Sequence, residues 1–244
     1  MKAIKDICYS KMGHPEQYLD IYLPEQEKFD VFVYIHGGGI EDGDKRCEEV
    51  IGKYLTEKGI ACVSINYRMY PQARYPEFIC DSAEAVGWVY KNIGQYGECT
   101  GMYIGGTSAG GYLTMMLCFD EKYLKPYNIP EGFIKGYVHD AGQPTVHFNV
   151  LRERGLDTRR VIVDEAAPLY HIGNAQSYSP MLFIVSDNDM EGRFEQTQLV
   201  LTTLKHFGYD QDKIFYRLEH GTHCHYAQTP KLGEFICEFI EKTR

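Results

Sequence analysis

Residues 101–119, GMYIGGTSAGGYLTMMLCF, contain in succession a short apolar run, a glycine-flanked serine and a second apolar run. The first run has the length and composition of a strand, and the second is typical of a helix that begins at Ala109. The motif Gly106-Thr107-Ser108-Ala109-Gly110 therefore falls at a tight strand-to-helix turn. Small flanking residues permit the strained backbone of such a turn, which pushes the serine side chain out of the sheet edge.

Segments with strand character and segments with helix character alternate along the chain. This alternation predicts an α/β fold with a mostly parallel central sheet and helices on both faces. Strands are expected at 18–24, 29–37, 61–67, 101–106, 134–140, 180–187 and 213–220, and helices at about 44–59, 77–96, 109–124, 194–208 and 229–243. The first strand alternates apolar and polar residues, which indicates a half-exposed strand. In the helix at 77–96, Ile79, Ala83, Val86, Val89 and Tyr90 recur at helical spacing and are expected in the core.

The composition predicts one soluble domain over residues 1–244. The chain has 44% hydrophobic and 24% charged residues, which is ordinary for a globular protein. Its formal net charge of −9 argues against nucleic acid or an anionic membrane as a partner, because both need a basic face. No apolar run is long enough to cross a membrane.

The cysteines and the first residues indicate a cytoplasmic protein. The eight cysteines form no CxxC pair, and Cys62, Cys118 and Cys237 lie within apolar runs, so we expect reduced, largely buried thiols. The opening residues, MKAIKDICYSKMGH, lack the apolar stretch of a secretory signal.

One connection between expected strands is unusually long, from residue 143 to about residue 176. A segment of about thirty residues exceeds an ordinary connection, and insertions of this kind often form a lid or a substrate wall. The alternative is a plain helix and loop with a solvated basic face at Arg152, Arg154, Arg159 and Arg160. The sequence leaves both interpretations open.

A second motif, His36-Gly37-Gly38-Gly39, ends the expected strand 29–37. Acyl transfer needs hydrogen-bond donors aimed at the developing oxyanion, and backbone amides serve where no side chain obstructs the approach. We therefore assign an oxyanion hole to the amides of Gly38, Gly39 and Ala109. His36 is expected to brace the loop, and Ser108 is the predicted nucleophile.

Four motifs in order, HGGG (36–39), NYRMYP (66–71), DSAEA (81–85) and GTSAGG (106–111), resemble those of the hormone-sensitive-lipase-like esterases and related small carboxylesterases. The similarity includes Tyr75-Pro76 and Ala167-Pro168 and covers most of the chain. It implies an α/β-hydrolase fold and ester hydrolysis through an acyl-enzyme. Those lipases usually carry a long helical region before HGGG, so the resemblance here is to compact esterases with a minimal cap. Some of these act on acetylated or feruloylated carbohydrates.

The acid of the catalytic triad should follow a late strand, since the order in this fold is serine, acid, histidine. The strand at 180–187 ends in Asp187, and Asp189 follows two residues later. The family turn is Gly-x-x-Asp, and Ser186-Asp187-Asn188-Asp189 matches it with serine in place of glycine. The resemblance therefore favours Asp189, and Asp187 is interpreted as a turn or capping residue.

The base should lie on the loop after the last strand, where the chain has His220, His223 and His225. The family pattern places a glycine shortly before the histidine, and Gly221-Thr222-His223 fits it. His223 is therefore the predicted base, with His220 as the alternative and His225 as a surface or wall residue. His223 would take the proton of Ser108 while the acid fixes its tautomer.

These patterns predict a serine carboxylesterase for small or aryl acyl esters, with a small-molecule ester as its partner and neither cofactor nor metal. They identify no substrate-binding side chain and no oligomeric state. An arylformamidase-type amidase would use the same triad, and a non-catalytic binding protein would use the same fold. A zinc site at the clustered histidines is a further alternative, although no HExxH motif accompanies them.

Overall fold

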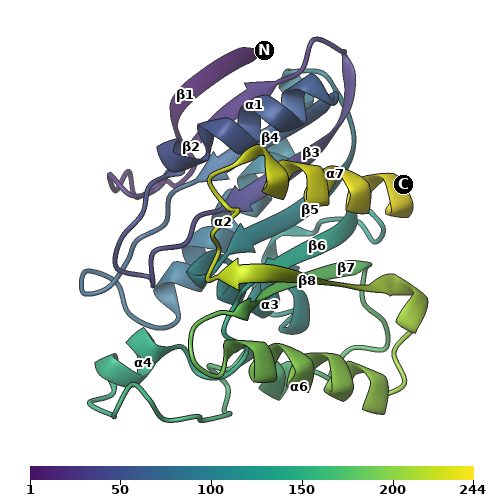
Figure 1. Cartoon of the computed structure of the whole chain (residues 1–244). Coiled ribbons are helices and arrows are strands. Elements are labelled where there is room, and N and C mark those ends of the chain that lie inside the picture. Colours follow the sequence, from purple (N-terminus) through teal and green to yellow (C-terminus); the bar gives the residue numbers. More distant parts are fainter.

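The computed structural model describes the backbone of residues 1–244 and every side chain except those of Cys47 and Glu48. One 8-stranded sheet crosses the protein in the order β1-β2-β4-β3-β5-β6-β7-β8 (Figure 1). The strands are β1 Lys2–Cys8, β2 Tyr18–Leu23, β3 Lys28–Ile35, β4 Ile60–Ile65, β5 Glu98–Thr107, β6 Ile134–Asp140, β7 Met181–Asn188 and β8 Ile214–Thr222. β2 pairs antiparallel with β1 and β4, and every other pair is parallel.

Helices cover both faces of this sheet, as the alternating sequence predicts. They are α1 Glu49–Glu57, α2 Glu77–Asn92, α3 Ala109–Phe119, α4 Phe148–Glu153, α5 Pro168–His171, α6 Arg193–His206 and α7 Pro230–Thr243. Short 3-10 helices lie at Lys45–Glu48, Ile93–Gln95, Lys125–Tyr127 and Gln211–Lys213. α1 and α7 lie side by side and enclose one core with the sheet, whereas α2, α3 and α6 enclose the other (Figure 1).

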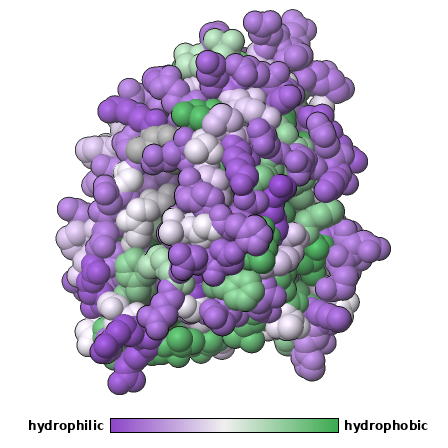
Figure 2. Space-filling model, in the orientation of Figure 1, coloured by the Kyte–Doolittle hydropathy of each residue, from purple (hydrophilic) through white to green (hydrophobic). Residues whose placement is uncertain are grey.

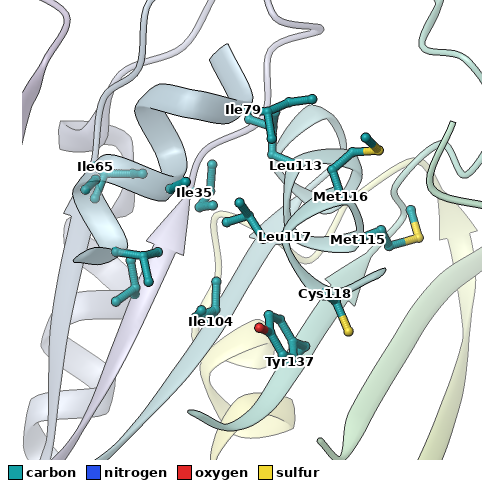
Figure 3. Packing of buried hydrophobic residues seen from close by; sticks show 14 of the residues in the cluster. Ile35, Ile65, Ile79, Ile104, Leu113, Met115, Met116, Leu117, Cys118 and Tyr137 are labelled. Atoms are coloured by element: carbon teal, nitrogen blue, oxygen red, sulfur yellow. The ribbon is translucent and has the colours of Figure 1, made fainter. Parts of the chain in front are cut away.

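The larger core surrounds α3. Every residue of α3 is buried, which suits a helix that is apolar on all sides rather than amphipathic. In Figure 3, side chains of α3 meet residues from the sheet and from α2; the labelled members are Ile35, Ile65, Ile79, Ile104, Leu113, Met115, Met116, Leu117, Cys118 and Tyr137. Truncating one of these side chains to alanine would cost about 2–5 kcal/mol in the free energy of unfolding.

Each expected strand and helix is present, with differences at the ends. α3 stops at Phe119, earlier than expected, because Asp120 leaves the helical conformation after its N–H bonds to the Met116 carbonyl. Four of the five expected core positions of α2 are confirmed, since Ile79, Ala83, Val86 and Val89 are buried, whereas Tyr90 is only partly buried and packs against the core. β1 was not expected from the sequence, and its residues are mostly exposed at the sheet edge.

The expectation that 18–24 forms a half-exposed strand is wrong. Five of the six residues of β2 are buried, because the strand lies inside the sheet and is covered on both faces. Its polar residue Asp20 is fully buried and bonds the Lys45 ammonium at 2.6 Å. The polar residue that suggested an exposed face of this strand is therefore a buried charge with a partner.

The expected burial of Cys62, Cys118 and Cys237 is confirmed, and the described cysteines carry free thiols. Cys47 lies outside the described side chains. In the part of the chain that the structure describes, none of the helices has the length and hydrophobicity of a transmembrane segment. Figure 2 shows a mostly hydrophilic face with smaller hydrophobic areas, in line with the formal net charge of −9.

Candidate active site

Ser108 lies at the turn between β5 and α3, where the backbone is forced into an unusual conformation. Its φ is 57° and its ψ −112°, and its N–H donates to the Asp140 carbonyl at 2.7 Å. The turn presses against the end of β3: a Cβ atom at Gly110 would lie 2.0 Å from the Ile35 carbonyl oxygen, and one at Gly106 2.6 Å from it. Only glycine fits these two positions, which explains why the motif brackets the serine with glycines.

Three side chains from separate loops form a continuous chain of hydrogen bonds. His223 Nε2 lies 2.9 Å from Ser108 Oγ, and His223 Nδ1 lies 2.5 Å from Asp189 Oδ1. In the tautomer that serves both contacts, Nδ1 donates to the carboxylate and Nε2 accepts the serine proton. The structure thus brings together the three residues predicted as nucleophile, base and acid.

Asp189 is held in place from several directions. Its side chain is fully buried, and besides His223 it accepts hydrogen bonds from the backbone N–H groups of Ser186 and Met190. Burial raises the pKa of the Asp189 carboxyl, but the bonds from His223 and the two amides outweigh it and hold the pKa below its ordinary value. The group is therefore a stable anion at neutral pH.

The alternative pair occupies a separate, exposed position. His220 Nδ1 lies 2.6 Å from Asp187 Oδ2, and the His220 side chain is 87% exposed. His225 Nδ1 bonds the Thr222 carbonyl at 3.0 Å. The clustered histidines therefore do not converge, and among the described side chains no group of three or more His, Cys, Asp or Glu is placed to hold a metal ion.

Two of the three residues predicted for the oxyanion hole, Gly38 and Gly39, line the same cavity as Ser108. Gly38 has a φ of +101°, and a Cβ atom there would lie 1.8 Å from the Asp42 carbonyl oxygen, so the loop requires glycine. The loop is fastened through its carbonyls: Gly38 O accepts from the Glu41 and Asp42 amides, and Gly39 O from Asn149 Nδ2. Among the described residues, no loop or side-chain hydrogen bond uses the N–H groups of Gly38 and Gly39.

The His36 ring is buried and stacks on Tyr67, with ring centroids 4.6 Å apart. Its Nδ1 bonds the Gly37 carbonyl at 2.7 Å. Burial lowers the pKa of His36, so the ring is neutral at pH 7. These contacts agree with the expected bracing of the glycine loop.

A polar network that the sequence did not reveal lies beneath the serine. The buried Asp140 carboxylate accepts hydrogen bonds from Tyr226 at 2.5 Å and from Thr107 at 2.7 Å. Tyr34 continues the network with its hydroxyl 2.5 Å from Thr107 Oγ1. Burial raises the pKa of Asp140 to about 6. The available signal was its place: Asp140 ends a parallel strand, and the carboxyl ends of such strands meet at one sheet edge.

A cavity of about 780 Å³ lies over Ser108 and His223. Phe148 of α4 and Met190, which follows β7, form walls of this cavity and also border a second cavity of about 570 Å³. Figure 1 shows α4 at the lower left, on the side toward which the arrow of β8 points. Through Phe148, the 143–176 segment thus lines the cavity beside Ser108. Cys224 also lines the first cavity, and burial raises the pKa of its thiol.

A protein-family comparison matches the BD-FAE model to residues 19–151, more than half of the 244-residue chain. The chain belongs to the BD-FAE family. Among solved structures, this BD-FAE chain is similar to a truncated form of a carbohydrate esterase from gut microbiota, with a TM-score of 0.81, 18% identity and coverage of 100% and 96% of the two chains. It is also similar to esterase B from Lactobacillus rhamnosis, with a TM-score of 0.81, 17% identity and coverage of 99% and 86%. These likenesses establish the α/β-hydrolase fold.

Curated relatives of this BD-FAE chain include esterases. Esterase LipQ of Mycobacterium tuberculosis is 27% identical over 203 residues, which are 74% of this chain and 47% of LipQ. The isoprenylcysteine alpha-carbonyl methylesterase ICME of Arabidopsis thaliana is 29% identical over 110 residues, which are 44% of this chain and 26% of that protein. The chain therefore spans less than half the length of these relatives.

Proposed function

We propose that this protein is a serine carboxylesterase that hydrolyses esters of small or aryl acyl groups through an acyl-enzyme. The observation that carries the proposal is the pair of contacts on His223, 2.9 Å to the Ser108 hydroxyl and 2.5 Å to the Asp189 carboxylate. A base that touches both the nucleophile and a buried anion is the arrangement that activates a serine at neutral pH.

In the proposed reaction, His223 removes the Ser108 proton as Oγ attacks the ester carbonyl. Asp189, fixed by two backbone amides, stabilises the imidazolium that forms. The amides of Gly38, Gly39 and Ala109 donate to the tetrahedral oxyanion, a contribution typically worth about 3–4 kcal/mol of transition-state energy for each donor. His223 then protonates the leaving alcohol, and water repeats the cycle on the acyl-enzyme.

The substrate class has support from the names of similar proteins and from the walls of the cavity. A structural neighbour is a carbohydrate esterase, and LipQ is an esterase. The cavity over Ser108 is open and combines polar groups with the ring of Phe148, which suits an acetyl or aryl acyl group on a sugar alcohol. The oxyanion donors and the triad act equally on any such ester, so the walls decide specificity.

The test measures hydrolysis of 4-nitrophenyl acetate and labelling by a fluorophosphonate. Wild type should be labelled at one serine and should form an acetyl-enzyme seen by mass spectrometry. Ser108→Ala should lose both properties and at least a thousandfold in kcat with an unchanged circular dichroism spectrum. Ser177→Ala, which changes an exposed serine, is the matched control. Turnover by Ser108→Ala within tenfold of wild type contradicts the proposal.

A further inference from the structure

The cavity of about 570 Å³ behind Phe148 and Met190 adjoins the cavity over Ser108, since those two side chains border both. Its walls come from two segments far apart in the sequence. The 143–176 segment supplies Gln143 and residues 158–161, and the start of α6 supplies Arg193 and Gln196. A group joined to an ester at Ser108 and extending past Phe148 would enter this space.

Arg193 is the most unusual residue of this cavity. It is only 5% exposed, yet its guanidinium has a single protein acceptor, the carbonyl of Ala141. The charge of the Asp189 carboxylate acts on Arg193, but its hydrogen bonds go to His223 and to two backbone amides. Among the described side chains, Arg193 forms no ion pair. A buried guanidinium that no carboxylate contacts directly is costly, and most of its five N–H donors have no acceptor among the described residues.

Other groups around Arg193 also offer positive charge or donors. Gln196 accepts from Thr145 through Oε1 at 3.2 Å, which leaves its Nε2 amide without an acceptor among the described residues. Arg160 lines the cavity and, in the described part of the chain, has no carboxylate partner; its neighbour Arg159 pairs with Asp157. The N-terminus of α6 also faces the cavity, and its N-cap Gly192 supplies no side-chain cap.

One negative group borders the cavity, Glu191, and it is exposed to solvent. Arg193 and Arg160 thus place two cations without a direct carboxylate contact at one cavity, in a chain with a formal net charge of −9. Solubility does not explain it, since a buried arginine contributes little to the surface. A bound anion would explain it, because it would complete the pairing that the protein leaves undone.

We infer that this second cavity is a subsite for a carboxylate carried by the substrate. The inference rests on the proposed esterase function and adds its substrate class: esters with a free carboxylate on the acyl or the alcohol part. Arg193 binds the carboxylate through its planar fork, Gln196 Nε2 adds a neutral donor, and Arg160 attracts the anion from the outer side.

Two pairs of esters that differ only in charge test this inference and locate the carboxylate. In the acyl pair, the mono-4-nitrophenyl ester of glutaric acid is compared with 4-nitrophenyl 4-carbamoylbutanoate, its neutral amide. In the alcohol pair, 4-acetoxybenzoate is compared with 4-acetoxybenzamide. The ratio of kcat/KM, charged over neutral, should reach about tenfold in one pair, the size expected for a charge-assisted hydrogen bond. The pair that shows it identifies the side of the ester bond. Ratios at or below one in both pairs overturn the inference.

Variants of the cavity separate recognition from structural support. Arg193→Gln should lower the charged-over-neutral ratio of kcat/KM about tenfold in the pair that shows a preference. Arg160→Gln and Gln196→Ala should each lower it about threefold. Arg74→Gln, which removes an equal charge from an exposed residue outside both cavities, should leave the ratio unchanged. If Arg193 only stabilises the positions of Asp189 and Ala141, its replacement should lower kcat/KM for the charged and the neutral ester equally. Should Arg193→Gln fail to fold, the other two variants decide.

Binding measured by calorimetry distinguishes a failed inference from a failed enzyme function. Benzoate should bind at least tenfold more tightly than benzamide, and Arg160→Gln should reduce that preference. If charged and neutral esters are hydrolysed equally well, the esterase proposal stands and the carboxylate subsite is ruled out. An absence of all ester turnover, together with selective binding of benzoate, removes the esterase proposal and retains the anion site. Equal binding of benzoate and benzamide counts against the site.

Discussion

His220 Nδ1 lies 2.6 Å from the Asp187 carboxylate, so the ends of β7 and β8 carry two histidine–aspartate pairs that sequence spacing alone hardly separates. The pairs differ in exposure and in reach. The His220 ring is 87% exposed, whereas the His223 ring is 24% exposed and contacts Ser108. Only the second pair has the geometry of a base next to a nucleophile.

His223→Ala should therefore lower the single-turnover acylation rate by at least a thousandfold, because it removes the proton acceptor. His220→Ala should keep at least a tenth of wild-type activity and serves as the matched control. The measurement is stopped-flow release of nitrophenol from 4-nitrophenyl acetate. An inactive His220→Ala beside an active His223→Ala would assign the base to the other pair.

Gly38→Ala should lower kcat about a hundredfold or more, because a methyl group there collides with the Asp42 carbonyl and displaces the loop whose amides we propose as oxyanion donors. Gly13→Ala is the control, since Gly13 also has a positive φ, +65°, but no neighbour within 4 Å of an added Cβ. Steady-state kinetics of both variants with one short ester makes the comparison. Equal losses in the two variants would mean that general backbone strain, and not the oxyanion loop, causes the effect.

Acyl chains from acetyl to about butyryl, or an aryl acyl group, should give the highest kcat/KM. Selection of a long chain requires burial of roughly 0.8 kcal/mol for each methylene. The cavity over Ser108 is lined by glycines, histidines and aspartates, with Phe148 and Met190 among its few large apolar side chains. A series of 4-nitrophenyl esters measures the trend. A kcat/KM that climbs steadily from butyryl to palmitoyl would contradict this reading of the cavity.

Asp140 should make folding stability depend on pH. Its carboxyl pKa is about 6 in the folded protein, above the ordinary value of 3.8. Between these values the folded state holds the proton more firmly, so stability is lost as the pH rises through this window, by about 2 kcal/mol. Asp140→Asn should lack this component. Urea unfolding of both proteins from pH 4 to pH 7 should show the variant gaining about 2 kcal/mol relative to wild type. A constant difference would contradict the raised pKa.

Lys45 and Asp20 should behave as one unit. Their side chains are 3% and 0% exposed and lie 2.6 Å apart. Lys45→Met should reduce the free energy of unfolding by about 3–5 kcal/mol, because it leaves a buried carboxylate unpaired. The double variant Lys45→Met/Asp20→Asn should lose clearly less than the sum of the single losses. Urea unfolding measures the cycle, and additive losses would show that the two charges are independent.

Much of the catalytic edge could be predicted because chain order dictates it. In a parallel sheet all strands end at the same edge, so the residues after β3, β5, β7 and β8 meet there regardless of sequence distance. The turn at Ser108 also has strict local requirements, since Gly110 cannot bear a side chain. The local sequence was sufficient to predict a site residue wherever a strand end offered one candidate for one role.

The missed features depend on contacts between distant segments. Asp20 looked exposed because the sequence does not show that Lys45 pairs with it. Arg193 received no role from the sequence, because only the fold brings it to the same cavity as residues 158–161. Buried charges and shared cavities are properties of the packed chain, so periodicity does not reveal them.

The serine turn joins the buried end of β5 to a helix without an exposed residue. Segments of this kind exchange their amide hydrogens with solvent only when the whole domain opens. Residues 143–176 include exposed positions and short helices, so we expect them to open by local fluctuation before the sheet does. The turn at Ser108 should thus keep its structure until global unfolding, while the walls of the pocket sample several conformations. Substitutions in 143–176 can therefore accumulate during evolution without destabilising the turn between β5 and α3 that holds Ser108.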